Sequence, residues 1–135
     1  SRPGPLLVEG AGGLLVPLGP GTRMSDVARR CGLDVLIVAP LGLGTLNDTQ
    51  MTVRVAREEG LFVAGIILND LTGMESPSTR RNPSAIEELC DAPFLGVFPH
   101  ISGLDSGMKE SMEAGSIAAR RLGEAINCVR WNSLG

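Results

Sequence analysis

Residues 34–40 (DVLIVAP) and 61–70 (LFVAGIILND) are continuous apolar runs rich in β-branched side chains, and they constrain the fold most. A strand that is apolar at every position is buried on both faces, as in a parallel sheet covered by helices. Apolar residues at helical spacing lie between the two runs as far as Glu59, and Gly60 is a typical residue just beyond a helix end. This alternation predicts βαβ units in an α/β fold, with a mostly parallel open sheet flanked by helices.

Shorter segments continue the same alternation of strands and helices. We expect strands at residues 6–10 (LLVEG) and 93–99 (PFLGVFP), and a brief helix at residues 24–30 with Thr22 or Ser25 as its N-cap. The remaining expected elements are a polar loop at residues 71–83, a helix that starts at Pro83 in NPSAIEELC, and a closing helix at residues 110–126. No repeat or linker divides the chain, so residues 1–135 are predicted to form one domain.

Composition and charge exclude several classes of function. The net charge is −3 and aromatic residues make up 3% of the chain, so neither a basic stripe nor stacking platforms for nucleic acid are expected. No stretch reaches the roughly 18 apolar residues of a membrane span. Three widely spaced cysteines indicate free thiols in a cytoplasmic protein, and a single histidine without a CxxC pair leaves too few ligands for zinc.

The sequence contains no P-loop. Lys109 is its only lysine, and it lies in SGMKES rather than in a G-x-x-x-x-G-K-[ST] motif.

Ligands of open α/β sheets bind beyond the carboxyl ends of the strands, and three candidate sites fall there. The first is residues 7–13 (LVEGAGG). Glu9, at the end of an expected strand, could hold a hydrated magnesium ion through oxygen contacts. Gly10, Gly12 and Gly13 would let the backbone approach a bulky anion. The alternative is a glycine-rich turn between two strands, with Glu9 solvated.

The second candidate is residues 41–49 (LGLGTLNDT), a glycine-rich turn that leads into a helix. Free N–H groups at a helix start attract a small carboxylate or phosphate, and Thr45 and Asn47 add polar side chains. The alternative is a simple turn in which Thr45 or Asn47 is the N-cap.

The third candidate is Asn69, in the LND sequence at the end of a strand. Its carboxamide offers both a donor and an acceptor, which suits the edge of a purine base. The alternative is an Asx-turn. Residues 98–101 (FPHI) end the next strand and could lie beside the same ligand. His100 is too isolated to be assigned a catalytic role, and no residue of the chain is predicted to be catalytic.

Taken together, the stretches LLVEGAGGLLVPL, DVLIVAPLGLGTLNDTQMTVRVAREEGLFVAGIILND and PFLGVFP resemble the dethiobiotin synthetase family over residues 6–99. The resemblance implies a fold similar to the P-loop NTPases and a homodimer. It also implies ATP- and Mg2+-dependent ring closure of 7,8-diaminononanoate with carbon dioxide, a step of biotin biosynthesis.

The same resemblance suggests a role for each candidate residue. Glu9 would be a carboxylate of the magnesium site, and Gly12 and Gly13 would line the phosphate and substrate region. Asn69 would recognise the adenine of ATP. The remaining roles are to receive the substrate carboxylate across the dimer interface, for Gly42, Leu43, Gly44, Thr45, Leu46 and Asn47, and to close the adenine pocket, for Pro99, His100 and Ile101.

The chain departs from the family pattern at its start, because family members begin with a strand and a P-loop. We therefore expect it to resemble the C-terminal half of the fold: a fragment, a half completed by a separate N-terminal P-loop half, or a remnant that repacks as a dimer. The missing strand would leave a gap in the sheet. Two other functions remain open: a non-catalytic dimerisation or ligand-binding module, and the synthetase domain of a cobyrinate amidase.

Overall fold

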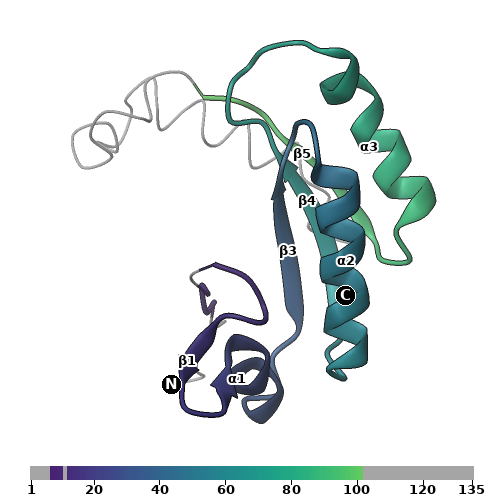
Figure 1. Cartoon of the computed structure of the whole chain (residues 1–135). Coiled ribbons are helices and arrows are strands. Elements are labelled where there is room, and N and C mark those ends of the chain that lie inside the picture. The colour runs from purple at the N-terminus through teal and green to yellow at the C-terminus, as the bar shows by residue number, and fades with distance from the viewer. Residues whose placement is uncertain (1–6, 11, 102–135) are drawn as a thin grey trace, which may run out of the picture.

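The computed structural model describes residues 7–10 and 12–101 of the chain. Within this part, three parallel strands form a sheet in the order β3-β4-β5 (Figure 1). They are β3 (Val35–Pro40), β4 (Val63–Asn69) and β5 (Phe94–Phe98). The crossovers contain the helices α2 (Thr45–Glu58) and α3 (Pro77–Leu89). The predicted α/β fold with a parallel sheet flanked by helices is confirmed.

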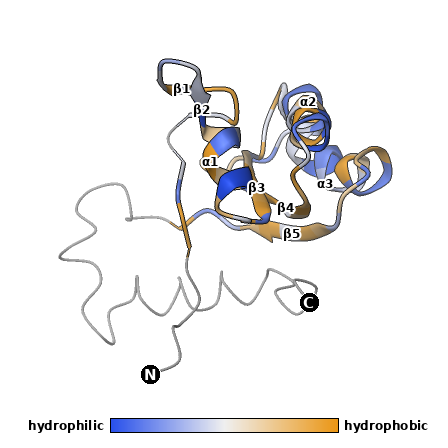
Figure 2. Cartoon of the chain, turned by 90° about the horizontal axis from the view of Figure 1, so that it is seen from below, coloured by the Kyte–Doolittle hydropathy of each residue, from blue (hydrophilic) through white to orange (hydrophobic). Residues whose placement is uncertain are grey.

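One face of the sheet packs against both crossover helices, which lie on the same side of it in Figure 2. Ile37 of β3 and the neighbouring Ile66 and Leu68 of β4 are buried there with Val53 of α2 and Ile86 of α3. The other face carries a smaller cluster, made of the buried Ile67 and Leu95 with Leu36 and Phe98 beside them. The main core therefore lies between the sheet and the two helices.

Strand β3 is less buried than its sequence suggested. Its apolar run predicted burial on both faces, yet Val38 is 60% exposed. Ile37 and Ala39 belong to the main core under the helices, so Val38 between them lies on the opposite face, where the described residues form only the small cluster of Ile67 and Leu95. An apolar run therefore identified the strand correctly but overstated its burial.

A small N-terminal unit precedes the sheet. The strands β1 (Pro17–Gly19) and β2 (Thr22–Arg23) form an antiparallel pair that the sequence did not predict, and α1 (Met24–Arg30) follows directly. Leu14 and Ala28 pack against the main core. Arg23 also approaches Glu59, just past the end of α2, at 3.5 Å.

The brief helix at residues 24–30 is confirmed, but its expected cap is wrong. Arg23 occupies the N-cap position, and its backbone N–H donates to the Asp26 carboxylate at 2.8 Å. Ser25 is buried within the helix, and Thr22 is the first residue of β2. Asp26 is the third residue of the helix, and its carboxylate accepts a hydrogen bond from the backbone of the N-cap residue, as the acidic residue of a capping box does.

The strand expected at residues 6–10 is not present in residues 7–10, which form no strand. Leu7 and Val8 are exposed, and no described strand lies alongside to complete a ladder. A lone strand leaves its backbone groups unpaired and is not stable by itself. The apolar pattern therefore predicted a strand that the described residues do not form.

Helix α3 begins six residues earlier than predicted, so the loop expected at residues 71–83 is wrong over its second half. Ser76 is the N-cap and accepts from the Thr79 backbone N–H at 3.1 Å, and Pro77 occupies the first helical position. A proline is favoured there because its missing N–H would be unpaired anyway. Pro83 lies inside the helix, which continues through it because the adjacent Asn82 and the nearby Ile86 are both buried.

Within residues 7–10 and 12–101, none of the helices has both the length and the apolar character that crossing a membrane would require. The closing helix expected at residues 110–126 lies outside the described residues.

Candidate functional site

The carboxyl ends of the three parallel strands meet at one edge of the sheet, at the top of Figure 1. Pro40 pairs with Asn69, and Asn69 pairs with Phe98. One further backbone hydrogen bond follows the last residues of each strand pair. The Leu41 N–H donates to the Asn69 carbonyl at 2.7 Å, and the Asp70 N–H donates to the Phe98 carbonyl at 2.9 Å. The segments that follow β3, β4 and β5 are therefore brought side by side.

The turn between β3 and α2 has a glycine at its critical position. Gly44 is the N-cap of α2 with φ +90°, and its side-chain-free backbone makes this left-handed conformation possible. Neither Thr45 nor Asn47 is the N-cap, which overturns that alternative. Thr45 is buried with its Oγ1 3.3 Å from that of Thr49, and the Asn47 amide donates to Asp48 at 3.2 Å.

This turn has the features of an anion site and one feature that opposes it. A helix start that lacks a side-chain cap leaves its first N–H groups available to a ligand. Leu43 projects from the turn and is 95% exposed. Asp48, exposed in the first turn, competes with a bound anion for the positive end of the helix. A small carboxylate fits this turn better than a multiply charged phosphate for that reason.

Asn69 ends β4 with its backbone paired and its side chain half-buried. The Asx-turn weighed for this position is formed by Asp70 instead, whose Oδ1 accepts from the N–H groups of Thr72 at 3.0 Å and Gly73 at 2.8 Å. Within residues 7–10 and 12–101, no hydrogen bond engages the Asn69 carboxamide. Its donor and acceptor therefore remain available to a ligand at the sheet edge.

The segment after β5 lies against the same turn. A Cβ placed on Gly73 would lie 3.0 Å from Cδ2 of His100, so the imidazole packs on the turn that follows Asn69. Ile101 is buried, while Pro99 and His100 are half-buried. The structure thus brings together Asn69 and residues 99–101, which the sequence assigned to one pocket.

Glu9, Gly12 and Gly13 lie apart from this edge. Residues 7–10 and 12–16, purple in Figure 1, run close to α1 and below the carboxyl ends of the strands, and a Cβ built on Gly10 would lie 3.1 Å from Cγ of Met24, the first residue of α1. Glu9 is exposed, and the position a Cβ of Gly12 would take lies 2.7 Å from Cγ2 of Val16. Val16 therefore fills the space that the glycine was expected to leave for a ligand, whereas the space at Gly13 is open. The roles assigned to these three residues stay predictions.

The described residues contain no group of three or more His, Cys, Asp or Glu side chains that could hold a metal ion by itself. A magnesium ion at Glu9 would depend on further ligands, such as the phosphates of a nucleotide.

A family model described as an AAA domain, AAA_26, matches residues 1–107. The chain belongs to this AAA domain family. The chain is also 43% identical over 98 residues to the ATP-dependent dethiobiotin synthetase BioD of Bacillus subtilis strain 168, a match that covers 73% of this chain and 42% of the relative. The enzymes with the same name from Anaeromyxobacter sp. strain K (43% over 99 residues, 73% and 44%) and Haloferax mediterranei (41% over 98 residues, 73% and 42%) are similar. The resemblance to dethiobiotin synthetases is confirmed, and the matched part spans about two fifths of these relatives.

Sequence reasoning missed one residue at this edge of the AAA domain. Asn82 of α3 is 5% exposed, and its Nδ2 donates to the Gly42 carbonyl at 2.6 Å. Asn82 directly precedes Pro83, the expected start of the helix, and a polar residue is common at such a position. The sequence therefore offered no reason to single it out. Only the path of α3 across the sheet reveals that this side chain touches the turn after β3.

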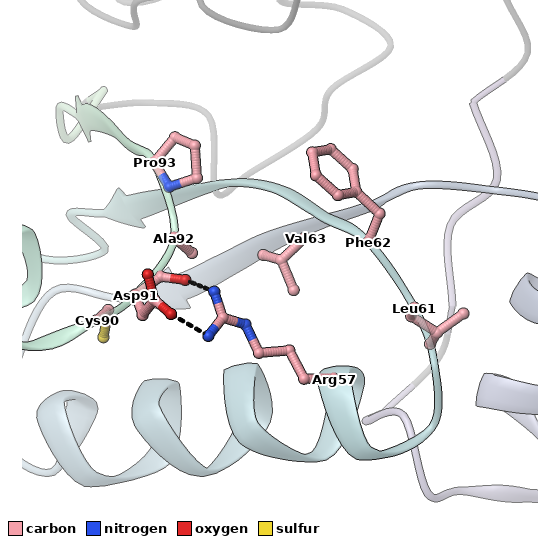
Figure 3. A pocket seen from close by; sticks show the side chains of 8 residues that line it. All are labelled: Arg57, Leu61, Phe62, Val63, Cys90, Asp91, Ala92 and Pro93. Atoms are coloured by element: carbon pink, nitrogen blue, oxygen red, sulfur yellow. Dashed lines mark hydrogen bonds and ion pairs between the residues drawn. The ribbon is translucent and has the colours of Figure 1, made fainter.

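A cavity of about 510 Å³ lies away from this edge, where α2 ends and β4 and β5 begin (Figure 3). It is lined by Leu61, Phe62, Val63 and Pro93, with Arg57 and Asp91 across its front. The Arg57 guanidinium donates to the Asp91 carboxylate and to the Asp91 backbone carbonyl. This ion pair ties the end of α2 to the loop before β5, and no candidate site residue lies in the cavity.

The Arg57 ion pair predicts a small dependence of stability on pH. Its hydrogen bond and charge hold the pKa of the Asp91 carboxyl below the usual value. A carboxyl whose pKa is lower in the folded state stabilises the fold above its unfolded pKa, near 3.9, and loses that effect as the pH falls through the folded pKa. We expect Asp91→Asn to lower the melting temperature slightly at pH 7, and the difference from wild type to shrink as the pH falls below about 3.9 and to be lost below the folded pKa of Asp91. Equal melting temperatures at pH 7 would contradict this. Glu88→Gln, which removes an exposed carboxylate of α3, is the control.

Proposed function

We propose that this chain forms part of an ATP-dependent dethiobiotin synthetase, the enzyme that closes the ring of dethiobiotin from 7,8-diaminononanoate and carbon dioxide. The observation that carries the proposal is the 43% identity over 98 residues to the Bacillus subtilis enzyme of that name. The arrangement of the sheet edge supports it, because two segments of different chemistry lie there: the Asn69 carboxamide with the segment after β5, and an uncapped helix start.

The proposed adenine site consists of Asn69 and residues 99–101. A carboxamide with no intramolecular partner in the described part of the chain can donate to one ring nitrogen and accept from the exocyclic amine of adenine. Phe98 and Asn69 are register partners on adjacent strands, so the segment after Phe98 begins beside the Asn69 side chain. Burial of Ile101 fixes the far end of this short segment. These residues would orient the base and exclude water from it.

The proposed substrate site is the turn formed by residues 42–47. Its open N–H groups would receive the single carboxylate of 7,8-diaminononanoate and so place the two amines away from the helix. Leu43 is 95% exposed, so the turn is open at the surface and a partner subunit's substrate could reach it. We also propose that the protein forms a homodimer, that residues 1–135 form a single domain, and that the protein is cytoplasmic.

ATP supplies the phosphoryl group that activates the carbamate of the substrate, and the fit of this chain to ATP is partial. The adenine end fits Asn69, but the sequence has no P-loop to hold the phosphates. We propose that residues outside this sequence, in the same polypeptide or in a separate N-terminal half, hold them. Glu9 would then contribute one oxygen ligand to the magnesium ion of the nucleotide.

We expect the isolated 135-residue chain to bind 7,8-diaminononanoate and to release no phosphate from ATP. Electrostatic stabilisation of the transferred group supplies most of the rate in phosphoryl transfer, and the P-loop is the main source of it in P-loop enzymes. Isothermal titration calorimetry measures the first expectation, and a phosphate assay with bicarbonate and Mg2+ the second. Absence of diaminononanoate binding would contradict the proposed substrate site, and steady turnover would contradict the need for a separate phosphate-binding segment.

A non-catalytic ligand-binding module is the second candidate, favoured by the uncapped helix start of α2 and the Asn69 carboxamide, which could bind ligands without taking part in catalysis. Ligand binding by such a module would not depend on metal. Adenosine triphosphate binding that is the same with and without Mg2+, and unchanged in Glu9→Gln, would favour the module over the synthetase.

A further inference from the structure

We propose that Asn82 is a positioning residue, whose carboxamide holds the turn of residues 42–47 in the shape that receives the substrate carboxylate. This inference rests on the proposed function for the identity of the ligand. The contact itself joins two segments 40 residues apart, the turn after β3 and the middle of α3.

The turn depends on an outside contact because little else restrains it. Gly42 and Gly44 have the wide backbone freedom of glycine, and Leu43 between them is almost fully exposed. A Cβ built on Gly42 would meet no atom within 4 Å, so no neighbouring group packs against it there. The 2.6 Å bond from Asn82 Nδ2 fixes the Gly42 carbonyl, and hence the peptide plane that leads into Leu43.

The other end of the turn is anchored independently. Thr45 is buried, its Oγ1 is 3.3 Å from that of Thr49, and the Asp48 N–H donates to the Gly44 carbonyl at 3.2 Å. The turn is therefore held at two points, by Asn82 at its start and by the first turn of α2 at its end. Between these points lie the N–H groups that would face an anion.

Helix α3 gives Asn82 a firm base. The helix is capped at Ser76 and buried through Ile86, one turn beyond Asn82. The two buried side chains have separate tasks, since Ile86 packs in the main core while Asn82 reaches the turn. Buried polar side chains require hydrogen bonds, and here the partner is a backbone carbonyl of the proposed site. Asn82 therefore couples the position of α3 to the shape of the turn.

The test compares Asn82→Ala and Asn82→Leu with Ile86→Val in the 135-residue chain. Asn82→Leu removes the carboxamide but keeps side-chain bulk and has higher helix propensity, so it retains α3 if the alanine variant folds poorly. Ile86→Val is the matched control, because it weakens the core from the same helix without touching the turn. Hydrogen exchange measures each backbone amide, and calorimetry measures the dissociation constant for 7,8-diaminononanoate.

We expect the Asp48 amide, the first of this turn with a partner (the Gly44 carbonyl at 3.2 Å), to exchange roughly tenfold faster in both Asn82 variants, as the loss of one buried hydrogen bond implies. We also expect diaminononanoate binding to weaken by roughly the same factor, with neither change in Ile86→Val. Exchange at the turn that stays as slow as in wild type, or that rises equally in Ile86→Val, would overturn the proposal, as would unchanged affinity alongside faster exchange. If the wild-type chain binds no diaminononanoate, the proposed function fails, while hydrogen exchange still decides whether Asn82 positions the turn.

Discussion

Leu68→Ala is expected to lower the free energy of unfolding by about 2–5 kcal/mol, the range found for buried leucines that leave a cavity. Leu68 is 0% exposed and lies in β4, the middle strand of the described sheet. It pairs with Ala39 of β3 and Val97 of β5, and it belongs to the core beneath α2 and α3. Small domains have only about 5–15 kcal/mol of stability in total, so this change should remove much of it.

Urea unfolding followed by circular dichroism would measure the effect of Leu68→Ala. The control is Leu89→Ala, which removes the same atoms from the last residue of α3, where the side chain is 55% exposed. Surface substitutions of this kind change stability by about 0.5 kcal/mol or less. Similar losses in the two variants would show that the core does not lie between the sheet and the two helices.

Asn69→Ala is expected to weaken adenosine binding by roughly 10- to 100-fold, because a buried base would lose its hydrogen-bond partner at a cost of about 1–3 kcal/mol. The fold should be little affected. The ladder contacts of Asn69 use its backbone, and its side chain makes no hydrogen bond within residues 7–10 and 12–101. Adenosine is the suitable probe because it lacks the phosphates that a P-loop would hold.

The matched control for Asn69→Ala is Asn47→Ala, which makes the same change at the proposed substrate turn. We expect Asn47→Ala to leave adenosine binding unchanged and to weaken the binding of 7,8-diaminononanoate. Calorimetry with each ligand separates the two sites. Adenosine binding that is equally strong in Asn69→Ala and wild type would refute the adenine assignment and leave the fold unaffected.

The elements that could be predicted from the sequence are those whose signals are local. The runs at residues 34–40 and 61–70 identified β3 and β4 because continuous burial selects β-branched side chains. Gly60 marked the end of α2 correctly, with a positive φ of +74° just beyond the helix. The ends of β4 and β5 lie side by side as expected, because parallel neighbours end at the same edge of a sheet, and a common ligand for Asn69 and residues 99–101 stays a prediction.

The errors arose where a distant part of the chain decides the local structure. Residues 7–10 have a strand-like pattern, but a strand also needs a neighbour, and the pattern does not supply one. Helix α3 was expected to start at Pro83, because proline is favoured in the first turn of a helix and normally interrupts one further along, yet Pro77 occupies the first position. Burial of Asn82 and Ile86 overrides that preference. The contact from Asn82 to Gly42 spans 40 residues and has no local signal.

The free edge of β3 in the described sheet has a consequence for the association of this chain with other molecules. In the described part of the chain this strand has β4 on one side and no strand on the other, and no charged residue lies within Val35–Pro40. Unpaired backbone groups along a sheet edge can form hydrogen bonds with a strand of another molecule. Charged side chains on the edge strand would disfavour this pairing, and β3 has none. A further strand that added to the described sheet at β3 would meet no charged side chain, and a lysine in place of the exposed Val38 should disfavour such addition.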